Sequence, residues 1–65
     1  MKPSCAAIIN YLSRAYPRYV SVPELSRECS QTDVRKRASE LIRAGYVIEK
    51  ERRGNFVNFR YGGNP

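Results

Sequence analysis

Residues 30–61, SQTDVRKRASELIRAGYVIEKERRGNFVNFRY, contain the two patterns that decide the fold. Up to Ala44 the apolar residues recur at three- and four-residue spacing, which predicts a helix. From Tyr46 onwards apolar residues recur at every second position, which predicts two strands joined by a turn. Gly45 separates the patterns and can take the left-handed backbone conformation that ends a helix. We therefore expect a basic helix followed directly by a β-hairpin.

The expected helix, residues 31–44, has an apolar and a polar side. Its buried stripe is predicted to consist of Val34, Ala38, Leu41 and Ile42. The opposite side carries Thr32, Lys36, Ser39 and Arg43, with Gln31 and Arg35 on one flank and Glu40 on the other. Ser30 and Asp33 are expected to cap its start. At 1.5 Å per residue such a helix would be about 20 Å long.

The expected hairpin has a cationic tip. Tyr46, Ile48 and Lys50 share one side of the first strand, and after the turn Val57, Phe59 and Tyr61 share an apolar side. The turn is expected at residues 52–55, Arg-Arg-Gly-Asn, because Gly54 and Asn55 both tolerate positive φ. Residues 62–65 are expected to be a frayed tail.

The first half of the chain predicts a small helical scaffold. Residues 4–16 carry apolar side chains at helical spacing, with Ser4 as the expected cap and Pro17 as the stop. Residues 19–21 read as a short strand. Ser21 and Glu24 fit a capping box that opens a second helix over residues 22–29, burying Leu25 and Cys29. The expected fold class is therefore α+β, in one domain spanning residues 1–65.

Charge is unevenly distributed along the 65 residues. The net charge is +6, with four basic and three acidic groups in residues 1–34 and eight basic and three acidic in residues 35–65. A basic surface of this kind favours a polyanionic partner, because neutralising phosphates releases condensed counterions. Nucleic acid is the partner that this composition predicts.

The sequence offers little for catalysis, and we expect no enzyme. It has no histidine, neither cysteine has a candidate base beside it, and Glu49 and Glu51 can pair with neighbouring basic residues. Cys5 and Cys29 are too few ligands for a metal site, and we expect two small buried thiols. No cofactor or small-molecule ligand is evident. The first twelve residues are too short and polar for a membrane span or secretory signal, so we expect a cytoplasmic, nucleoid-associated protein.

The order of these elements resembles the winged helix-turn-helix fold of many small bacterial and phage DNA-binding proteins. The resemblance covers residues 4–61 and is most specific in VPEL (22–25), TDVRKR (32–37) and LIRAGYV (41–47). It implies that the helix of residues 31–44 enters the major groove of double-stranded DNA. It also implies that the tip, residues 52–55, contacts the backbone or the adjacent minor groove.

These arguments predict a sequence-specific DNA-binding protein, most simply a small transcriptional regulator. The candidate DNA-binding residues are Gln31, Thr32, Arg35, Lys36, Ser39, Arg43, Lys50, Arg52, Arg53 and Asn55. Arginine suits such a site because its planar fork can bind guanine O6 and N7 together.

Two alternative functions and the oligomeric state stay open at this point. The protein can be an architectural or recombination accessory factor of the excisionase type. It can also be a protein-interaction module, for which the acidic residues Glu40, Glu49 and Glu51 near the basic surface are the supporting feature. Finally, the long helices that dimerise many winged-helix regulators are missing, which leaves a monomer or a weak homodimer on DNA through a patch such as Ala6, Ala7 and Tyr11.

Overall fold

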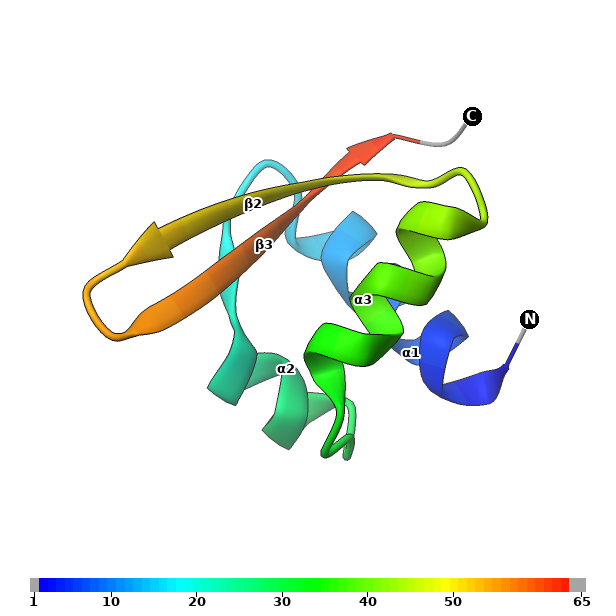
Figure 1. Ribbon diagram of the computed structural model, residues 1–65, viewed down its shortest axis with the longest axis horizontal. Coiled ribbons are helices and arrows are strands. Elements are labelled where there is room, and N and C mark those ends of the chain that lie inside the picture. Colours follow the sequence, from blue (N-terminus) through cyan, green and yellow to red (C-terminus); the bar gives the residue numbers. More distant parts are fainter. Residues whose placement is uncertain (1, 64–65) are drawn as a thin grey trace.

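The computed structural model describes residues 2–63, which form three helices and a three-stranded antiparallel sheet (Figure 1). In chain order the elements are α1 (Pro3–Ala15), β1 (Val20–Ser21), α2 (Val22–Glu28), α3 (Val34–Arg43), β2 (Val47–Arg53) and β3 (Phe56–Gly63). This arrangement confirms the expected α+β winged-helix architecture, including the short strand between the first two helices.

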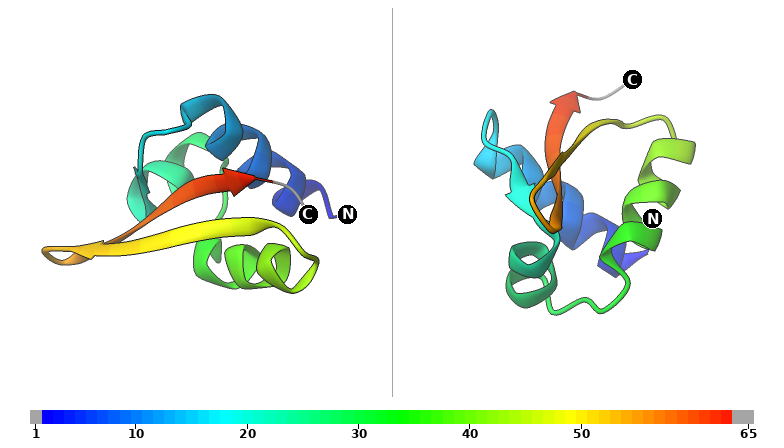
Figure 2. Two further views of the ribbon diagram at one scale, coloured as in Figure 1. Left: turned by 90° about the horizontal axis from the view of Figure 1, so that it is seen from above. Right: turned by 60° about the vertical axis from the view of Figure 1, so that its left-hand side comes forward.

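The sheet has the order β1-β3-β2, so that β3 is its central strand. Val20 pairs with Phe59 on one side of β3, and Lys50 pairs with Phe59 on the other. The hairpin runs across the helices, with β3 against α1 and α2 and β2 beside α3 (Figure 2). Its tip projects beyond the helices, at the end of the molecule opposite the start of α1 and the end of β3 (Figure 1).

The core is small and entirely apolar. Among residues 2–63 the buried residues are Cys5, Ile8, Ile9, Leu12, Val20, Leu25, Val34, Ala38, Leu41 and Phe59. They come from all three helices, from β1 and from the centre of β3, so every element except β2 contributes a buried residue to one shared interior. Burial of such side chains contributes about 1.5–3 kcal/mol each, which makes this set the main source of stability.

Helix α1 begins two residues earlier than a cap at Ser4 would place it. Pro3 occupies the first turn, where no backbone N–H is needed, and Lys2 rather than Ser4 is the N-cap residue. The cap expected from Ser4 is therefore wrong. Tyr16, expected on the buried face, lies just beyond the helix, is 58% exposed, and packs edge-on against Tyr61 with ring centroids 6.2 Å apart.

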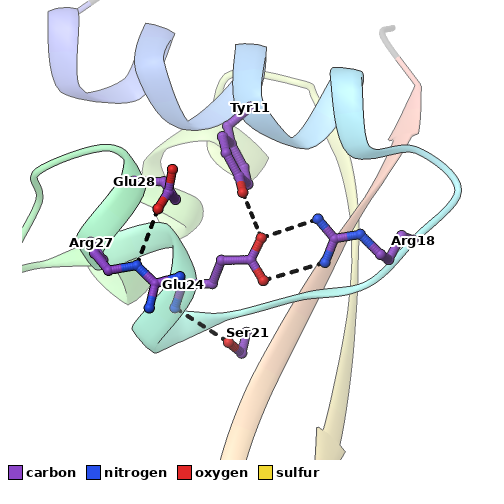
Figure 3. A network of polar contacts seen from close by, with 6 residues as sticks. All are labelled: Tyr11, Arg18, Ser21, Glu24, Arg27 and Glu28. Carbon is purple, nitrogen blue, oxygen red and sulfur yellow. Dashed lines mark hydrogen bonds and ion pairs between the residues drawn. The ribbon is translucent and has the colours of Figure 1, made fainter.

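The α2 N-terminus is held by a polar network centred on Glu24 (Figure 3). Ser21 Oγ accepts the Glu24 backbone N–H at 3.3 Å, as the capping box predicts. The Glu24 carboxylate, however, does not return to Ser21. It accepts the Tyr11 hydroxyl at 2.5 Å and both guanidinium nitrogens of Arg18 at 3.0 and 3.3 Å. The reciprocal half of the capping box is replaced by a link between α1, the following loop and α2.

The turn between α2 and α3 is longer than predicted, and α3 begins at Val34. Ser30 takes a φ of 55°, and the Gln31 N–H donates to the Ser26 carbonyl at 3.0 Å, which closes the turn. Asp33 is the N-cap residue, but its side chain makes no capping hydrogen bond. The predicted caps are therefore wrong. With its bounds at Val34 and Arg43, α3 is about 15 Å long at 1.5 Å per residue rather than about 20 Å.

The end of α3 agrees with the sequence prediction. Gly45 has a φ of 106°. Its N–H donates to the Ile42 carbonyl at 3.0 Å, and the Tyr46 N–H donates to the Leu41 carbonyl at 3.1 Å. These two bonds form a Schellman motif, which requires the left-handed conformation that glycine adopts without a Cβ clash.

The hairpin turn consists of two residues, Gly54 and Asn55. Only Gly54 has positive φ, at 62°, which is the pattern of a type II′ turn. Pairing continues to Val47 opposite Gly63, so Gly62 and Gly63 belong to β3 and not to a frayed tail. A Cβ at Gly62 would lie 2.7 Å from a Val47 side-chain carbon, which explains why glycine is needed there. Residues 64 and 65 lie outside the described residues.

Ile42 departs most clearly from the expected core. It is 48% exposed, whereas Val34, Ala38 and Leu41 are buried as predicted. Ile42 lies on the side of α3 that faces the hairpin, where the inward-facing residues of β2 beyond Ile48 are the basic Lys50 and Arg52. Long basic side chains do not close over α3, so this side of Ile42 remains open to solvent.

We expect Leu41→Ala and Ile42→Ala to differ sharply although the residues are adjacent. Truncating buried Leu41 leaves a cavity and should cost about 2–5 kcal/mol of unfolding free energy. The same truncation at Ile42 should cost about 1 kcal/mol or less, as at most partly exposed sites. Urea unfolding followed by circular dichroism measures both. Equal losses would contradict the open position of Ile42.

A pH dependence follows from the Glu24 network. The Arg18 guanidinium, and then the Tyr11 hydroxyl, hold the pKa of Glu24 below its ordinary value of 4.5. A lowered pKa stabilises the folded state fully above that ordinary value, and the contribution is lost as the pH falls through the folded-state pKa. Glu24→Gln should therefore melt at a lower temperature than wild type at about pH 7, with the difference shrinking at about pH 3. A difference that stays constant between these pH values would contradict the network's role.

Candidate nucleic-acid interface

Helix α3 presents different surfaces to the hairpin, to solvent and to α1. Arg35, Ser39 and Ile42 line the side towards the hairpin. Lys36 and Arg43 are exposed directly opposite the buried residues. On the side towards α1, the Glu40 carboxylate accepts a hydrogen bond from the Arg37 guanidinium, with an N–O distance of 2.8 Å. Its other oxygen lies 3.6 Å from Nζ of Lys2, at the α1 N-terminus. The acidic residue of α3 is thus turned away from the hairpin, as the helical periodicity predicts.

The pairing register of the hairpin sorts its charges onto two faces. Residues directly opposite one another project to the same face, and successive residues alternate. Lys50 opposite Phe59 and Arg52 opposite Val57 therefore lie on the inner face, with the core residues. The outer face carries Glu49 opposite Arg60, Glu51 opposite Asn58, and Arg53 opposite Phe56. Both glutamates are on the face that points away from the helices.

A groove of about 450 Å³ lies between α3 and the inner face of the hairpin. It is lined by Arg35, Ala38, Ser39, Ile42, Ile48, Lys50, Val57 and Phe59. Basic groups come from both walls, the hydroxyl of Ser39 comes from the α3 wall, and apolar side chains form the floor. This groove brings the basic side of α3 and the basic side of β2 into one surface.

Ion pairing leaves this surface without compensating charge. Within residues 2–63 the basic residues that pair with a carboxylate are Lys2, Arg18, Arg27, Arg37, Arg53 and Arg60. The basic residues without such a pair in this part of the chain are Arg14, Arg35, Lys36, Arg43, Lys50 and Arg52. Apart from Arg14, which is on α1, all of the second group lie on α3 or β2.

Most of the residues predicted from the sequence come together on this surface. Arg35, Lys36, Ser39 and Arg43 are exposed on α3, and Lys50 and Arg52 are exposed on β2. Thr32 is exposed in the turn that precedes α3. The α3 side and the inner hairpin face therefore form the candidate interface.

Three predicted residues are placed differently. Gln31 precedes α3, and its side-chain amide donates to the Cys29 carbonyl at 3.1 Å, so it helps to hold the turn. Arg53 and Asn55 lie at the hairpin tip, which projects beyond the helices and away from α3 (Figure 1). Arg53 pairs with Glu51 at 3.0 Å on the outer face, although its side chain remains 80% exposed.

Arg60 contributes to the sheet and not to the interface. It forms an ion pair with Glu49, and its guanidinium carbon lies 4.6 Å from the centre of the Tyr19 ring. The hydrogen bond to Glu49 is the largest cause that raises the pKa of Arg60. Tyr19, just before β1, thus contacts Arg60 on β3, which in turn pairs with Glu49 on β2.

Sequence reasoning missed the apolar floor of the groove. The helical spacing predicts a buried Ile42, and the alternation of the hairpin identifies Ile48 and Val57 only as apolar positions. All three line the groove. A signal was present in the alternation of β2, where the inward positions change from Ile48 to Lys50 and Arg52. An inward face that turns basic before the strand ends indicates a hairpin that extends past its core.

The cysteines are structural. Both thiols are free, and Cys5 is buried as expected, but Cys29 is only half-buried. Burial is the main cause that raises the pKa of each thiol. Cys5 lies under α3 with Sγ 3.4 Å from Glu40 Oε1, and Cys29 Sγ lies 3.6 Å from the Ala7 carbonyl. Within residues 2–63 no group of three or more histidine, cysteine or acidic side chains could hold a metal ion.

The same part of the chain contains no helix with the length and apolar character needed to cross a bilayer. Comparison of the chain with protein-family models, curated proteins and solved structures gave no match. The candidate interface is therefore defined by its geometry and charge.

Proposed function

We propose that this protein binds double-stranded DNA in a sequence-specific manner, with α3 in the major groove and the hairpin tip on the backbone or in the minor groove. The observation that carries the proposal is the distribution of unpaired charge. Arg35, Lys36 and Arg43 are exposed on α3, Lys50 and Arg52 are exposed on the inner face of β2, and within residues 2–63 none of them pairs with a carboxylate. Such a surface is suited to neutralise phosphates.

The exposed side of α3 supplies the proposed base contacts. A B-DNA major groove about 12 Å wide admits one helix, and arginine can bind two acceptors of guanine at once. Arg35 and Lys36 are exposed in the first turn of α3 and Ser39 near its middle, and all three would face base edges. Arg43, in the last turn, and Thr32, before the first, would then lie near the flanking phosphates.

The hairpin supplies the proposed backbone contacts. Lys50 and Arg52 extend the basic surface along β2, and Arg53 and Asn55 stand at the tip beyond the helices. A projecting tip of this kind can reach the backbone or the minor groove next to the one that α3 occupies. The simplest biological role is that of a small transcriptional regulator, which would place the protein in the cytoplasm with the nucleoid.

The structure weakens the sequence feature that favoured a protein-interaction module. Glu40 faces α1, and Glu49 and Glu51 lie on the outer hairpin face, so none of them borders the groove. The dimerisation patch also loses support, because Tyr11 is half-buried and donates its hydroxyl to Glu24.

Phe56 favours a second candidate function, that of an architectural or recombination accessory factor that bends DNA. It is 54% exposed beside the hairpin tip, opposite Arg53. Exposed apolar side chains next to arginine are used by such proteins to wedge open base steps from the minor groove. Gel mobility of circularly permuted duplexes separates the two roles, because an unbent complex excludes the architectural one.

We expect duplex binding to depend strongly on salt. Four to six phosphate contacts, roughly the number of basic side chains on the surface, should give a slope of about −4 to −5 in log K against log salt concentration. Selection from a random duplex library identifies the recognised site, and fluorescence anisotropy with the selected duplexes at several salt concentrations measures the slope. A slope near zero, or no duplex binding at low salt, would contradict the proposal.

Substitutions should divide the interface into two kinds of residue. Arg35→Ala and Lys36→Ala should reduce discrimination between selected and random duplexes, by about 1–3 kcal/mol where a bidentate base contact is lost. Arg52→Ala and Arg53→Ala should weaken all duplexes to a similar extent. The matched control is Arg14→Ala, which removes an exposed, unpaired arginine from α1 and should leave discrimination unchanged. An equal effect of all five substitutions would leave only non-specific binding.

A further inference from the structure

The groove between α3 and the hairpin has the properties of a ligand site as well as those of a DNA-binding surface. Its volume of about 450 Å³ is within the range of about 300–1,000 Å³ typical of sites for small molecules. Its floor is apolar, with Phe59 buried at the back and Ile42 left 48% exposed at the opening. An open apolar floor of this kind gains free energy when a small apolar group covers it.

The charge at the rim selects the type of ligand. Arg35 stands on the α3 wall and Lys50 on the β2 wall, and among residues 2–63 no acidic side chain lines the groove. Within residues 2–63 neither Arg35 nor Lys50 has an ion-pair partner. A ligand that carries one negative charge can therefore interact with both cations while its apolar part remains on the floor.

Two further hollows among residues 2–63 lack this combination. The hollow of about 410 Å³ between α1 and α3 has Lys2 at its edge, but Glu40 lines it as well and pairs with Lys2. The hollow of about 260 Å³ beside α1 is lined by Arg14 and by Arg18, and Arg18 is engaged by Glu24. The groove thus combines an apolar floor with unpaired charge from two separate elements.

We propose that this groove binds a small amphiphilic carboxylate, with a flat apolar body against Ile42, Val57 and Phe59 and the carboxylate between Arg35 and Lys50. Because Arg35 and Lys50 belong to the candidate DNA interface, the bound carboxylate excludes DNA from it. Only this exclusion of DNA rests on the proposed function. The protein would then be a DNA-binding protein that an apolar organic acid releases.

The first experiment uses the free protein without DNA. Titration of ¹⁵N-labelled protein with 2-naphthoate should produce saturable NMR shift changes in residues 35–42 and 48–59, leaving the exposed face of α1 unaffected. The uncharged analogue 2-naphthamide should bind about tenfold more weakly, because it cannot form charge-assisted contacts with the two cations. Equal affinity for both compounds, or shifts centred elsewhere, would overturn the proposal.

Variants test the assignment of the two walls. Arg35→Gln and Lys50→Gln should each weaken 2-naphthoate by about tenfold, whereas the matched control Arg14→Gln should not change its affinity. Ile42→Asn should also weaken it, and the half-exposed position of Ile42 means that the fold should tolerate this change. Unchanged affinity in all three groove variants would overturn the site. Concentration-dependent shifts of the same residues without ligand would assign the groove to a second copy of the chain instead.

The competition experiment separates the two proposals. Adding 2-naphthoate to a preformed duplex complex should release the DNA from wild type at the concentrations that saturate the groove, and should release it from the Ile42→Asn variant only at higher concentrations. If naphthoate binds the free protein but no duplex does, the ligand site stands and the proposed DNA function falls. If the duplex binds but naphthoate binds neither the free protein nor the duplex complex, the proposed DNA function stands and the ligand site falls. Simultaneous binding of both would overturn the competition.

Discussion

The alternation of side chains along β2 is the constraint on which the charged surface depends. Glu49, Glu51 and Arg53 project to the outer face, and Ile48, Lys50 and Arg52 to the inner face. A slip of one residue in the register would exchange these two sets and place carboxylates against α3. The register from Arg53 to Ile48 is set by the two-residue turn at Gly54 and Asn55, and it shifts only between Ile48 and Val47, at the other end of the hairpin.

Stability and the candidate interface are supplied by different parts of the molecule. The polar networks around Glu24 and Glu40 tie α1 to α2 and α3 on the side away from the groove. For Glu40, burial alone would raise the pKa, but the Cys5 hydrogen bond and the charges of Arg37 and Lys2 outweigh it and hold the pKa below its ordinary value. Carboxylates engaged in this way are not free to compensate Arg35, Lys50 or Arg52.

The sequence predicted the architecture well because its signals are local. Helical spacing identified the buried residues of α1 and α3, Gly45 marked the end of α3, and alternation identified the hairpin. The errors occurred where a distant partner decided the outcome. The Glu24 carboxylate binds Arg18 and Tyr11, which the fold places beside it, instead of completing the capping box. Gln31 donates hydrogen bonds to the carbonyls of Cys29 and Ser26 and so holds the turn. No local pattern contains these contacts.

The candidate site could be predicted only in part, because some of its features are local and others depend on distant contacts. Its residues on α3 follow from the helical period once Val34, Ala38 and Leu41 are known to be buried. Whether Ile42 is covered depends on how far β2 stands from α3, which the sequence does not state directly. The ion pairs that engage Arg53 and Arg60, and leave Lys50 and Arg52 without partners, depend on the strand register.

The most direct test places one carboxylate on the acid-free surface. Ser39 is exposed on α3, one helical turn from both Arg35 and Arg43, so Ser39→Glu would supply the partner that these residues lack. Duplex affinity should fall by at least about tenfold. In contrast, Ser13→Glu on the exposed face of α1, with the same change in net charge, should have little effect. An equal loss of affinity in the two variants, or no loss in either, would contradict the account.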